Sequence, residues 1–251
     1  MRDEARAVVD AARAEGLTVR LLGGLGVREH CRDLELCARD YSDIDLVGRA
    51  AESRRLATLL ARFGYREDYA VAGATGNGQL QFVRPCRHGA KRRRPHDDDH
   101  IDVFLDTFRM DHTLALRDRL HLDPYTLAPA DLLLTKLQVF RLTEKDARDI
   151  VTLLDAFAVD DPSAPATIDA GAVARRCATD WGLFHDVATN LQRVGELLPG
   201  LALDDARQAH VRRGLARLTG ALDDAPKSLR FRARARVGTR VAWHSEVDDR
   251  D

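Results

Sequence analysis

Two carboxylates one residue apart are the part of this sequence best suited to chemistry. Asp43 and Asp45 lie in the run Tyr-Ser-Asp-Ile-Asp-Leu-Val. In an extended strand, residues i and i+2 project from the same face, so these two side chains point the same way while Ile44 and Leu46 enter a core. Two like charges side by side repel unless a cation lies between them. Oxygen ligands favour Mg²⁺, which usually bridges to substrate phosphates. The pair therefore predicts a metal-dependent enzyme that handles phosphates.

A third carboxylate follows in a later strand. The run His-Ile-Asp-Val-Phe-Leu at 100–105 alternates in polarity, which predicts a core strand with Asp102 on one face. Nucleotidyl transfer is an in-line displacement at phosphorus, and two metal ions about 3.5–4 Å apart can clamp the attacking and leaving oxygens. Asp102 joins Asp43 and Asp45 in such a site if the two strands are neighbours.

A glycine pair supplies the expected phosphate contact. Gly23 and Gly24 directly follow the apolar run 19–22 and begin a predicted helix. Glycines let the backbone approach triphosphate oxygens, and a helix N-terminus favours anions. The order strand, Gly-Gly, helix, D-x-D strand and later acidic strand is more specific than any of its parts.

The elements that must position these residues follow from apolar periodicity. We predict an α+β fold, in which a mixed β-sheet flanked by helices (domain 1–125) is followed by a helical C-terminal domain (126–251). Pro129-Ala-Asp opens a predicted helix that has Asp131 as its N-cap and continues through Leu137 to Phe140. Residues 160–165 are a predicted linker. The predicted helices are 3–15, 23–39, 54–63, 144–157, 170–179, 183–196 and 203–222. The predicted strands are 17–22, 44–47, 65–71, 79–83, 100–105 and 113–122.

Composition sets broad limits. The 251 residues are 45% apolar and 31% charged, enough for one or two domains. No stretch approaches the roughly 20 apolar residues of a membrane span, and the charged N-terminus lacks a secretory apolar region. The four cysteines are scattered without C-x-x-C spacing. We therefore expect a cytoplasmic protein with reduced thiols and no membrane partner.

At the level of motifs, the chain resembles the nucleotidyltransferase superfamily related to DNA polymerase β. The matching runs are Leu-Leu-Gly-Gly-Leu-Gly-Val (21–27), Ser-Asp-Ile-Asp-Leu-Val (42–47) and Ile-Asp-Val (101–103). The segments 130–141 and 144–150 are similar to the helical motifs of the AbiEii-type, minimal branch, which pairs a helix Lys with a K/R-D-x-x-D motif. The resemblance covers residues 17 to 157. Two departures are the eighteen residues between Gly24 and Asp43 and the absence of the Gly-Ser hydroxyl.

The resemblance implies a Mg²⁺-dependent enzyme that transfers a nucleoside monophosphate from an NTP to an acceptor hydroxyl. Asp43 and Asp45 would be metal ligands, and Asp102 a third ligand or the base. The nucleotide-binding residues would be Gly23, Gly24, Lys136, Asp146 and Asp149. The AbiEii-type motifs imply an RNA acceptor such as a tRNA 3′ end, as in toxin members of that branch, and an antitoxin partner. The alternatives are a small-molecule acceptor, as for antibiotic-modifying relatives, and a catalytically silent nucleotide-binding module.

Each of these residues also has a simpler structural interpretation. The paired aspartates could be solvated acids at a strand end, and Asp102 could pair with an arginine. Lys136 could extend its charge to solvent past leucines. Asp146 and Asp149 could form helix ion pairs with their basic neighbours, each worth a few tenths of a kcal/mol.

Two basic segments interrupt a chain of net charge −1. Six of the twelve residues at 84–95 are Lys or Arg, which could track nucleic-acid phosphates or form a solvated loop. Zinc is disfavoured there because Lys-Arg-Arg-Arg lies among the candidate ligands Cys86, His88, His96 and His100. The second segment contains Arg-Phe-Arg-Ala-Arg-Ala-Arg at 230–236, which could be a phosphate-binding edge or a helical or disordered tail.

Overall fold

The computed structural model describes residues 1–33, 35–69, 78–84, 99–160, 163–164 and 166–245. The chain forms two compact units. The first contains Met1–Glu29, Arg39–Phe108 and Leu114–Ala128, and the second contains His30–Ala38, Arg109–Thr113 and Pro129–Asp251. Each is described by itself, and the predicted boundary at residue 125 stays a prediction.

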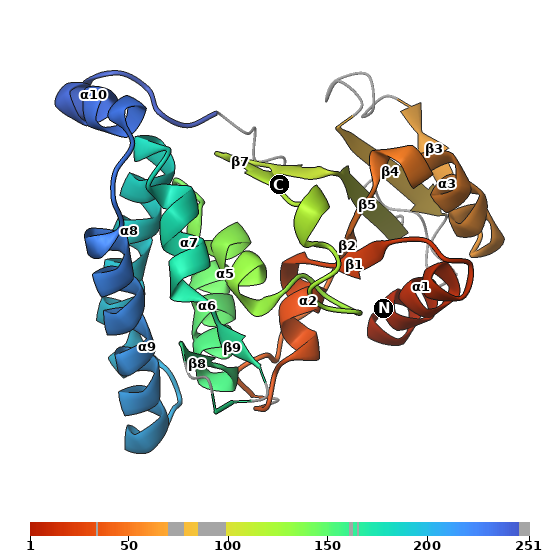
Figure 1. Ribbon diagram of the computed structural model, residues 1–251. Helices are drawn as coiled ribbons and strands as arrows, with labels where there is room; N and C mark the ends of the chain where they lie inside the picture. The colour runs from red at the N-terminus through yellow and green to blue at the C-terminus, as the bar shows by residue number, and fades with distance from the viewer. Residues whose placement is uncertain (34, 70–77, 85–98, 161–162, 165, 246–251) are drawn as a thin grey trace. The chain divides into compact units, whose positions relative to one another are not determined.

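The first unit is built on a five-stranded mixed sheet in the order β1-β2-β5-β4-β3 (Figure 1). β2 and β5 are parallel, and the other neighbours are antiparallel. The sheet and the helices that follow later in the chain confirm the predicted α+β class. The strands are β1 (Val19–Leu21), β2 (Asp43–Gly48), β3 (Arg66–Asp68), β4 (Gln79–Arg84) and β5 (Asp99–Leu105).

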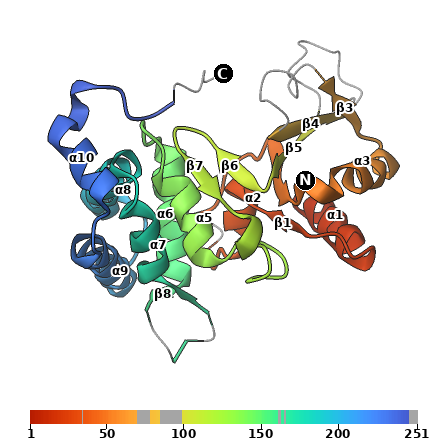
Figure 2. The same cartoon turned by 45° about the horizontal axis from the view of Figure 1, so that its top comes forward.

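Two helices cover one face of this sheet (Figure 2). α1 (Arg2–Ala14) and α3 (Ser53–Arg62) are amphipathic, and their buried residues join alternate residues of the strands in one core. Because side chains alternate along a strand, these positions fix which residues face the helices. The strand residues in this core include Ile44, Leu46, Leu80, Phe82, Ile101 and Val103.

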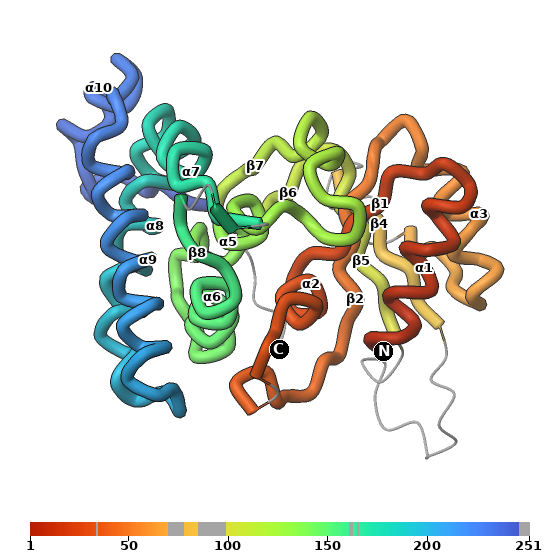
Figure 3. The backbone as a smooth tube through the Cα atoms, turned by 60° about the horizontal axis from the view of Figure 1, so that its bottom comes forward, coloured from red at the N-terminus to blue at the C-terminus, as the bar shows by residue number. Residues whose placement is uncertain are grey.

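The helix after the Gly-Gly turn is shorter than predicted. α2 spans Gly23–Glu29, whereas the sequence predicted a helix to residue 39. The side chain of Asp33 accepts the backbone N–H of Glu35 at 2.9 Å, a local bond that competes with helix formation. The chain then runs through irregular structure and turns to β2 (Figure 3). The predicted strand at 113–122 is also shorter: β7 is Thr113–Ala115, paired with β6 (Thr107–Arg109).

The second unit is mainly helical. Asn190 is buried, and its Nδ2 donates to the carbonyl oxygens of Leu137 at 2.9 Å and Val139 at 2.6 Å, which satisfies acceptors where α5 ends. A parallel pair, β8 (Ala158–Val159) with β9 (Thr167–Ile168), flanks the predicted linker. The helices are α5 (Pro129–Leu137), α6 (Glu144–Ala156), α7 (Ala170–Cys177), α8 (Trp181–Leu197), α9 (Asp205–Asp224) and α10 (Leu229–Val237), and short 3₁₀ turns accompany them. None of the described helices has the length and apolar character needed to cross a membrane.

The expectation of reduced thiols is wrong for one pair of cysteines. Cys31 and Cys37 form a disulfide, with their Cα atoms 6.6 Å apart. Their six-residue separation matches no common motif, so the turn at Asp33, not the spacing, brings them together. Cys177 is free and buried, and burial raises its pKa to about 12.

This bond predicts a measurable redox difference. A digest made without reductant should contain Cys31 and Cys37 in one linked peptide, and dithiothreitol should separate them. Closing so short a loop is expected to stabilise the fold by about 2 kcal/mol, measured by urea unfolding with and without reductant. Iodoacetamide labelling of both cysteines in the unreduced protein would contradict the assignment.

Candidate metal-binding face of the sheet

The face of the sheet opposite α1 and α3 carries the predicted acids. Ile44 and Ile101 face the helices, so Asp43, Asp45 and Asp102 project from the other side. The parallel register pairs Asp45 with Asp102 and Asp43 with His100. β2 and β5 are therefore neighbouring strands, as the predicted site requires, and their acids lie on one face of the sheet.

Asp102 lies among polar side chains of β4 and β5. Its Oδ1 accepts hydrogen bonds from the side-chain amides of Gln79 at 3.3 Å and Gln81 at 3.1 Å, both from β4. Nε2 of His100 lies 3.9 Å from its Oδ2. Burial raises the pKa of Asp102, and the nearby charge of Asp43 raises it further, against the opposing effects of His100 and the two amides. A cation would stabilise this carboxylate by opposing both effects that raise its pKa.

Asp45 fits against the glycine turn. Gly23 has a φ of +61°, a conformation that favours glycine, and a Cβ built there would collide with Oδ2 of Asp45. The backbone N–H of Leu22 also donates to the carbonyl oxygen of Asp45 at 3.1 Å. The first glycine is therefore needed by both backbone conformation and the close approach of this carboxylate.

Arg39 adds a positive charge beside the second glycine. A Cβ built at Gly24 would collide with its guanidinium and lie 3.2 Å from Cε1 of Tyr41. The Arg39 guanidinium also lies over the Tyr41 ring, 4.9 Å from its centroid. Neither residue was singled out from the sequence, and a lone Arg in a polar stretch gives no signal there. Gln79 and Gln81 were missed as site residues, and His100 was considered only as a zinc candidate, because the strand pairing that places them is not visible in the sequence.

The donors on this face suit Mg²⁺ by their chemistry. They are carboxylate oxygens on neighbouring strands, and the hydrogen bonds that Asp102 accepts at Oδ1 come from neutral amides. In the part of the chain that the structure describes, no three His, Cys, Asp or Glu side chains are already gathered as metal ligands. Asp45 lies beside Gly23, and rotation about its side-chain torsions would bring its carboxylate to the metal ion.

The predicted nucleotide-binding residues of the helices form a network in the second unit. Nζ of Lys136 lies 3.2 Å from Oδ1 of Asp146 and 3.0 Å from Oδ2 of Asp149. The Thr143 hydroxyl caps α6 by accepting the Asp146 backbone N–H and donating to its carboxylate. Lys136 thus links α5 to α6. Asp146 and Asp149 pair with this lysine of another helix, whereas the simpler interpretation had them pair with basic neighbours on their own helix. Their part in nucleotide binding stays a prediction.

Of the basic loop 84–95, only Arg84 lies among the described residues, and its role is structural. Its guanidinium is ion-paired with Glu4 and with Asp99, the latter at 2.6 Å. It also lies over the Tyr65 ring at 4.3 Å, so it joins α1, β4 and β5. The remaining basic residues of the loop, and the zinc candidates Cys86, His88 and His96, lie outside the described residues.

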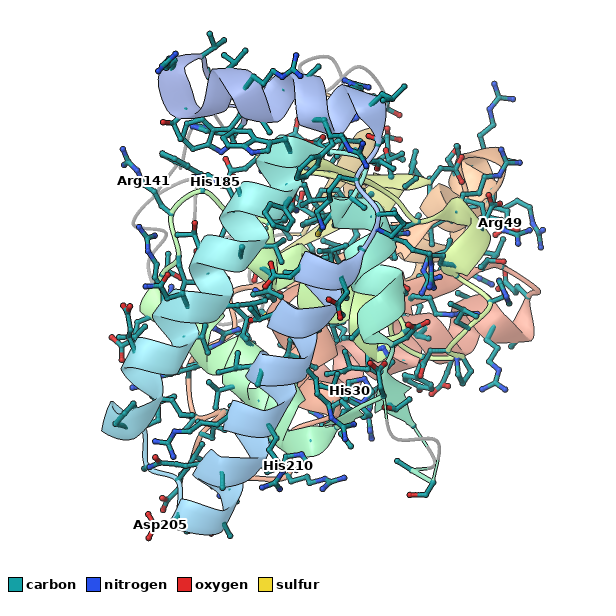
Figure 4. All side chains as sticks on the ribbon, turned by 60° about the vertical axis from the view of Figure 1, so that its left-hand side comes forward. His30, Arg49, Arg141, His185, Asp205 and His210 are labelled. Carbon is teal, nitrogen blue, oxygen red and sulfur yellow. A yellow bond between two sulfur atoms is a disulfide. The ribbon has the colours of Figure 1, made fainter. Side chains whose placement is uncertain are left out.

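A separate hollow of about 620 Å³ lies in the second unit. Arg207 of α9 bonds to both oxygens of Asp155 and, at 2.7 Å, to Asp33, whose pKa it lowers. Its cation is already matched by two carboxylates, so it fixes the segment 30–38 within this unit. Figure 4 labels Asp205 and His210 on the same helix. The lining residues are Arg32, Asp33, Asp155, Ala206, Arg207 and His210.

Comparisons with known proteins find similarity among solved structures. No protein-family model matches the sequence, and no curated protein matches it significantly. The structure is similar to the crystal structure of an antigenic nucleotidyltransferase-like protein from Paracoccidioides brasiliensis, with a TM-score of 0.44 and 13% sequence identity. The likeness covers 90% of this chain and 94% of that chain. Similarity at this level does not establish a shared activity, which must be argued from the residues.

The glycine turn gives a stability prediction. Gly23→Ala should lower the free energy of unfolding by about 1–3 kcal/mol, because the new Cβ adopts a strained φ and meets Asp45. Gly220→Ala, in α9 with nothing within 4 Å of the added carbon, should stabilise the protein by up to about 1 kcal/mol. Urea unfolding measures both, and equal effects would contradict the packing of Asp45 on Gly23.

The ion pairs of Lys136 give a second stability prediction. Lys136→Met leaves two largely buried carboxylates without their shared cation, which should cost about 3–5 kcal/mol. Arg148→Met removes an exposed pair with Glu144, whose side chain is 78% exposed, and should cost well under about 1 kcal/mol. Thermal unfolding distinguishes them. A Lys136→Met protein as stable as the Arg148→Met protein would show that the network contributes little.

Proposed function

We propose that this protein is a metal-dependent nucleotidyltransferase, which transfers a nucleoside monophosphate from an NTP to an acceptor hydroxyl. The observation that carries the proposal is the parallel register of β2 and β5, because it sets Asp45 beside Asp102 on the face opposite the helices. Three acids on one sheet face are hard to explain by stability, since their mutual repulsion opposes folding.

Each acid has a distinct role in this proposal. Asp43 and Asp45 would hold Mg²⁺, with Asp102 as a third ligand or as the base. Bound Mg²⁺ would neutralise charge on the phosphates and orient them for in-line displacement. The acceptor oxygen forms a bond to the α-phosphorus as the bond to pyrophosphate breaks, and the hydroxyl proton goes to Asp102. Oδ2 is the better placed oxygen for that proton, because Oδ1 already accepts from Gln79 and Gln81.

The phosphate chain of the NTP is assigned to the glycine turn. Gly23 and Gly24 leave their backbone open to close approach, and the Arg39 guanidinium beside Gly24 supplies positive charge for a phosphate oxygen. Lys136, with Asp146 and Asp149, is retained as a nucleotide-binding group. Its Nζ already lies within ion-pair distance of both acids.

The acceptor is proposed to be RNA, such as a tRNA 3′ end. The support is the similarity of segments 130–141 and 144–150 to the AbiEii-type motifs. A toxin of this kind would act with an antitoxin partner. A small hydroxylated compound is the competing acceptor, and the experiment below includes it.

The test measures the transfer of a label from the α-phosphate of an NTP to an acceptor. The protein with Mg²⁺ and each α-labelled NTP should transfer label to total tRNA, and Asp43→Asn/Asp45→Asn should reduce the rate roughly a thousandfold, the several kcal/mol that a metal supplies. The matched control, Asp223→Asn/Asp224→Asn, removes the same charge from exposed positions at the end of α9 and should retain activity.

Three outcomes separate the alternatives. Label on an aminoglycoside panel but not on tRNA would replace the RNA acceptor with a small molecule. An equal rate in both variants would remove Asp43 and Asp45 from the mechanism. No transfer to either acceptor, with NTP binding intact, would favour the catalytically silent module.

A further inference from the structure

The C-terminal part of the described chain is rich in positively charged residues. The whole sequence is balanced, with 39 basic and 40 acidic residues. The segment Lys227–Arg240 contains six basic residues and no acidic one. Most of it forms α10, which begins at Ser228, whose hydroxyl caps the Phe231 backbone N–H at 3.1 Å. The segment is therefore an ordered basic helix, not a strand edge.

Two residues hold this helix on the second unit. Phe231 is buried in edge-to-face contact with Phe184 of α8 at 5.2 Å. Arg234 lies over the Trp181 ring at 4.9 Å, and its Nη1 donates to the carbonyl oxygen of Gly238 at 2.6 Å. Figure 4 shows α10 next to α8, on which His185 is labelled. Arg234 is thus committed to structure, which separates it from the other arginines.

The remaining arginines of the segment face solvent. Arg232 and Arg236 are exposed and four residues apart, so they lie on one side of the helix, and Arg230 and Arg240 are also exposed. Among the residues that the structure describes, these four form no ion pair with a carboxylate. Like charges at i and i+4 destabilise a helix by a few tenths of a kcal/mol, so stability does not account for the row.

We propose that the exposed arginines of α10 bind the phosphate backbone of RNA. The planar guanidinium makes two parallel hydrogen bonds to a phosphate, and Arg232 and Arg236 on one side of α10 complement neighbouring phosphates of a polyanion. An anionic membrane is the weaker fit, because Leu229, Val237 and Val241 are the only large apolar side chains exposed nearby among the described residues, too few for an inserting face. The choice of RNA over DNA rests on the proposed function, which transfers a nucleotide to an RNA hydroxyl.

The test measures binding, without Mg²⁺ or NTP, so that it is independent of catalysis. Fluorescence anisotropy with a labelled tRNA-sized RNA compares the wild-type chain with Arg232→Gln/Arg236→Gln. The matched control is Arg212→Gln/Arg213→Gln, an equal charge change at exposed positions of α9. Gln keeps helix propensity, so circular dichroism and melting should be unchanged. The α10 variant should bind about tenfold more weakly, and the slope of log affinity against log salt should fall by roughly 1.4 to 1.8 for two lost phosphate contacts.

Several results would overturn the proposal. They are an unchanged affinity in the α10 variant, an equal loss in the α9 control, and tighter binding to vesicles of anionic phospholipid than to RNA. Equal affinity for duplex DNA would overturn the choice of RNA. If wild-type protein binds RNA through α10 but transfers no label, the proposed function fails while this inference stands.

Discussion

The parallel pairing of β2 with β5 is the constraint on which the candidate site depends. Because side chains alternate, sliding β5 by one residue against β2 would turn Asp102 into the core and bring Ile101 and Val103 out of it. The helices α1 and α3 prevent this, since they bury Ile44 and Leu46 on the same face as those residues. The apolar face of the sheet therefore fixes the geometry of the polar face, and the site needs no further scaffold to set which acids are neighbours.

The partners of each acid distinguish Asp102 from the carboxylates that are paired with Arg or Lys. Asp99 pairs with Arg84, Asp155 pairs with Arg207, and Asp149 pairs with Lys136, so each of these buried or half-buried charges is matched by a cation within its own unit. Asp102 instead accepts hydrogen bonds from two neutral amides, and Nε2 of His100 lies 3.9 Å from its other oxygen. Burial raises the pKa of Asp102. A buried carboxylate with a raised pKa is a candidate for binding a ligand or transferring a proton.

Alternation and glycine placement were enough to predict the strands of Asp43 and Asp102 from the sequence, and the structure confirms both strands. Strand neighbours were not predictable in the same way, so Gln81 was missed although it pairs with Asp102. The helix after Gly24 was predicted too long, because a turn set by the Asp33 side chain competes with apolar spacing. The Arg–Ala alternation of 230–236 suggested a strand edge among other structures, but the Ser228 cap begins a helix there.

The separation of β2 from β5 along the chain affects how the protein is made. Between Asp45 and Asp102 lie 56 residues, including α3, β3 and β4, so the contact that defines the site is among the most distant in sequence within the sheet. Non-local pairing of this kind closes late in folding, after its entropic cost is met. On the ribosome, β2 emerges after its neighbour β1 but before its neighbour β5, so the edge that β5 will cover stays open and invites aggregation. A nascent chain therefore carries Asp43 and Asp45 before the strand of Asp102 has been synthesised and added to the sheet.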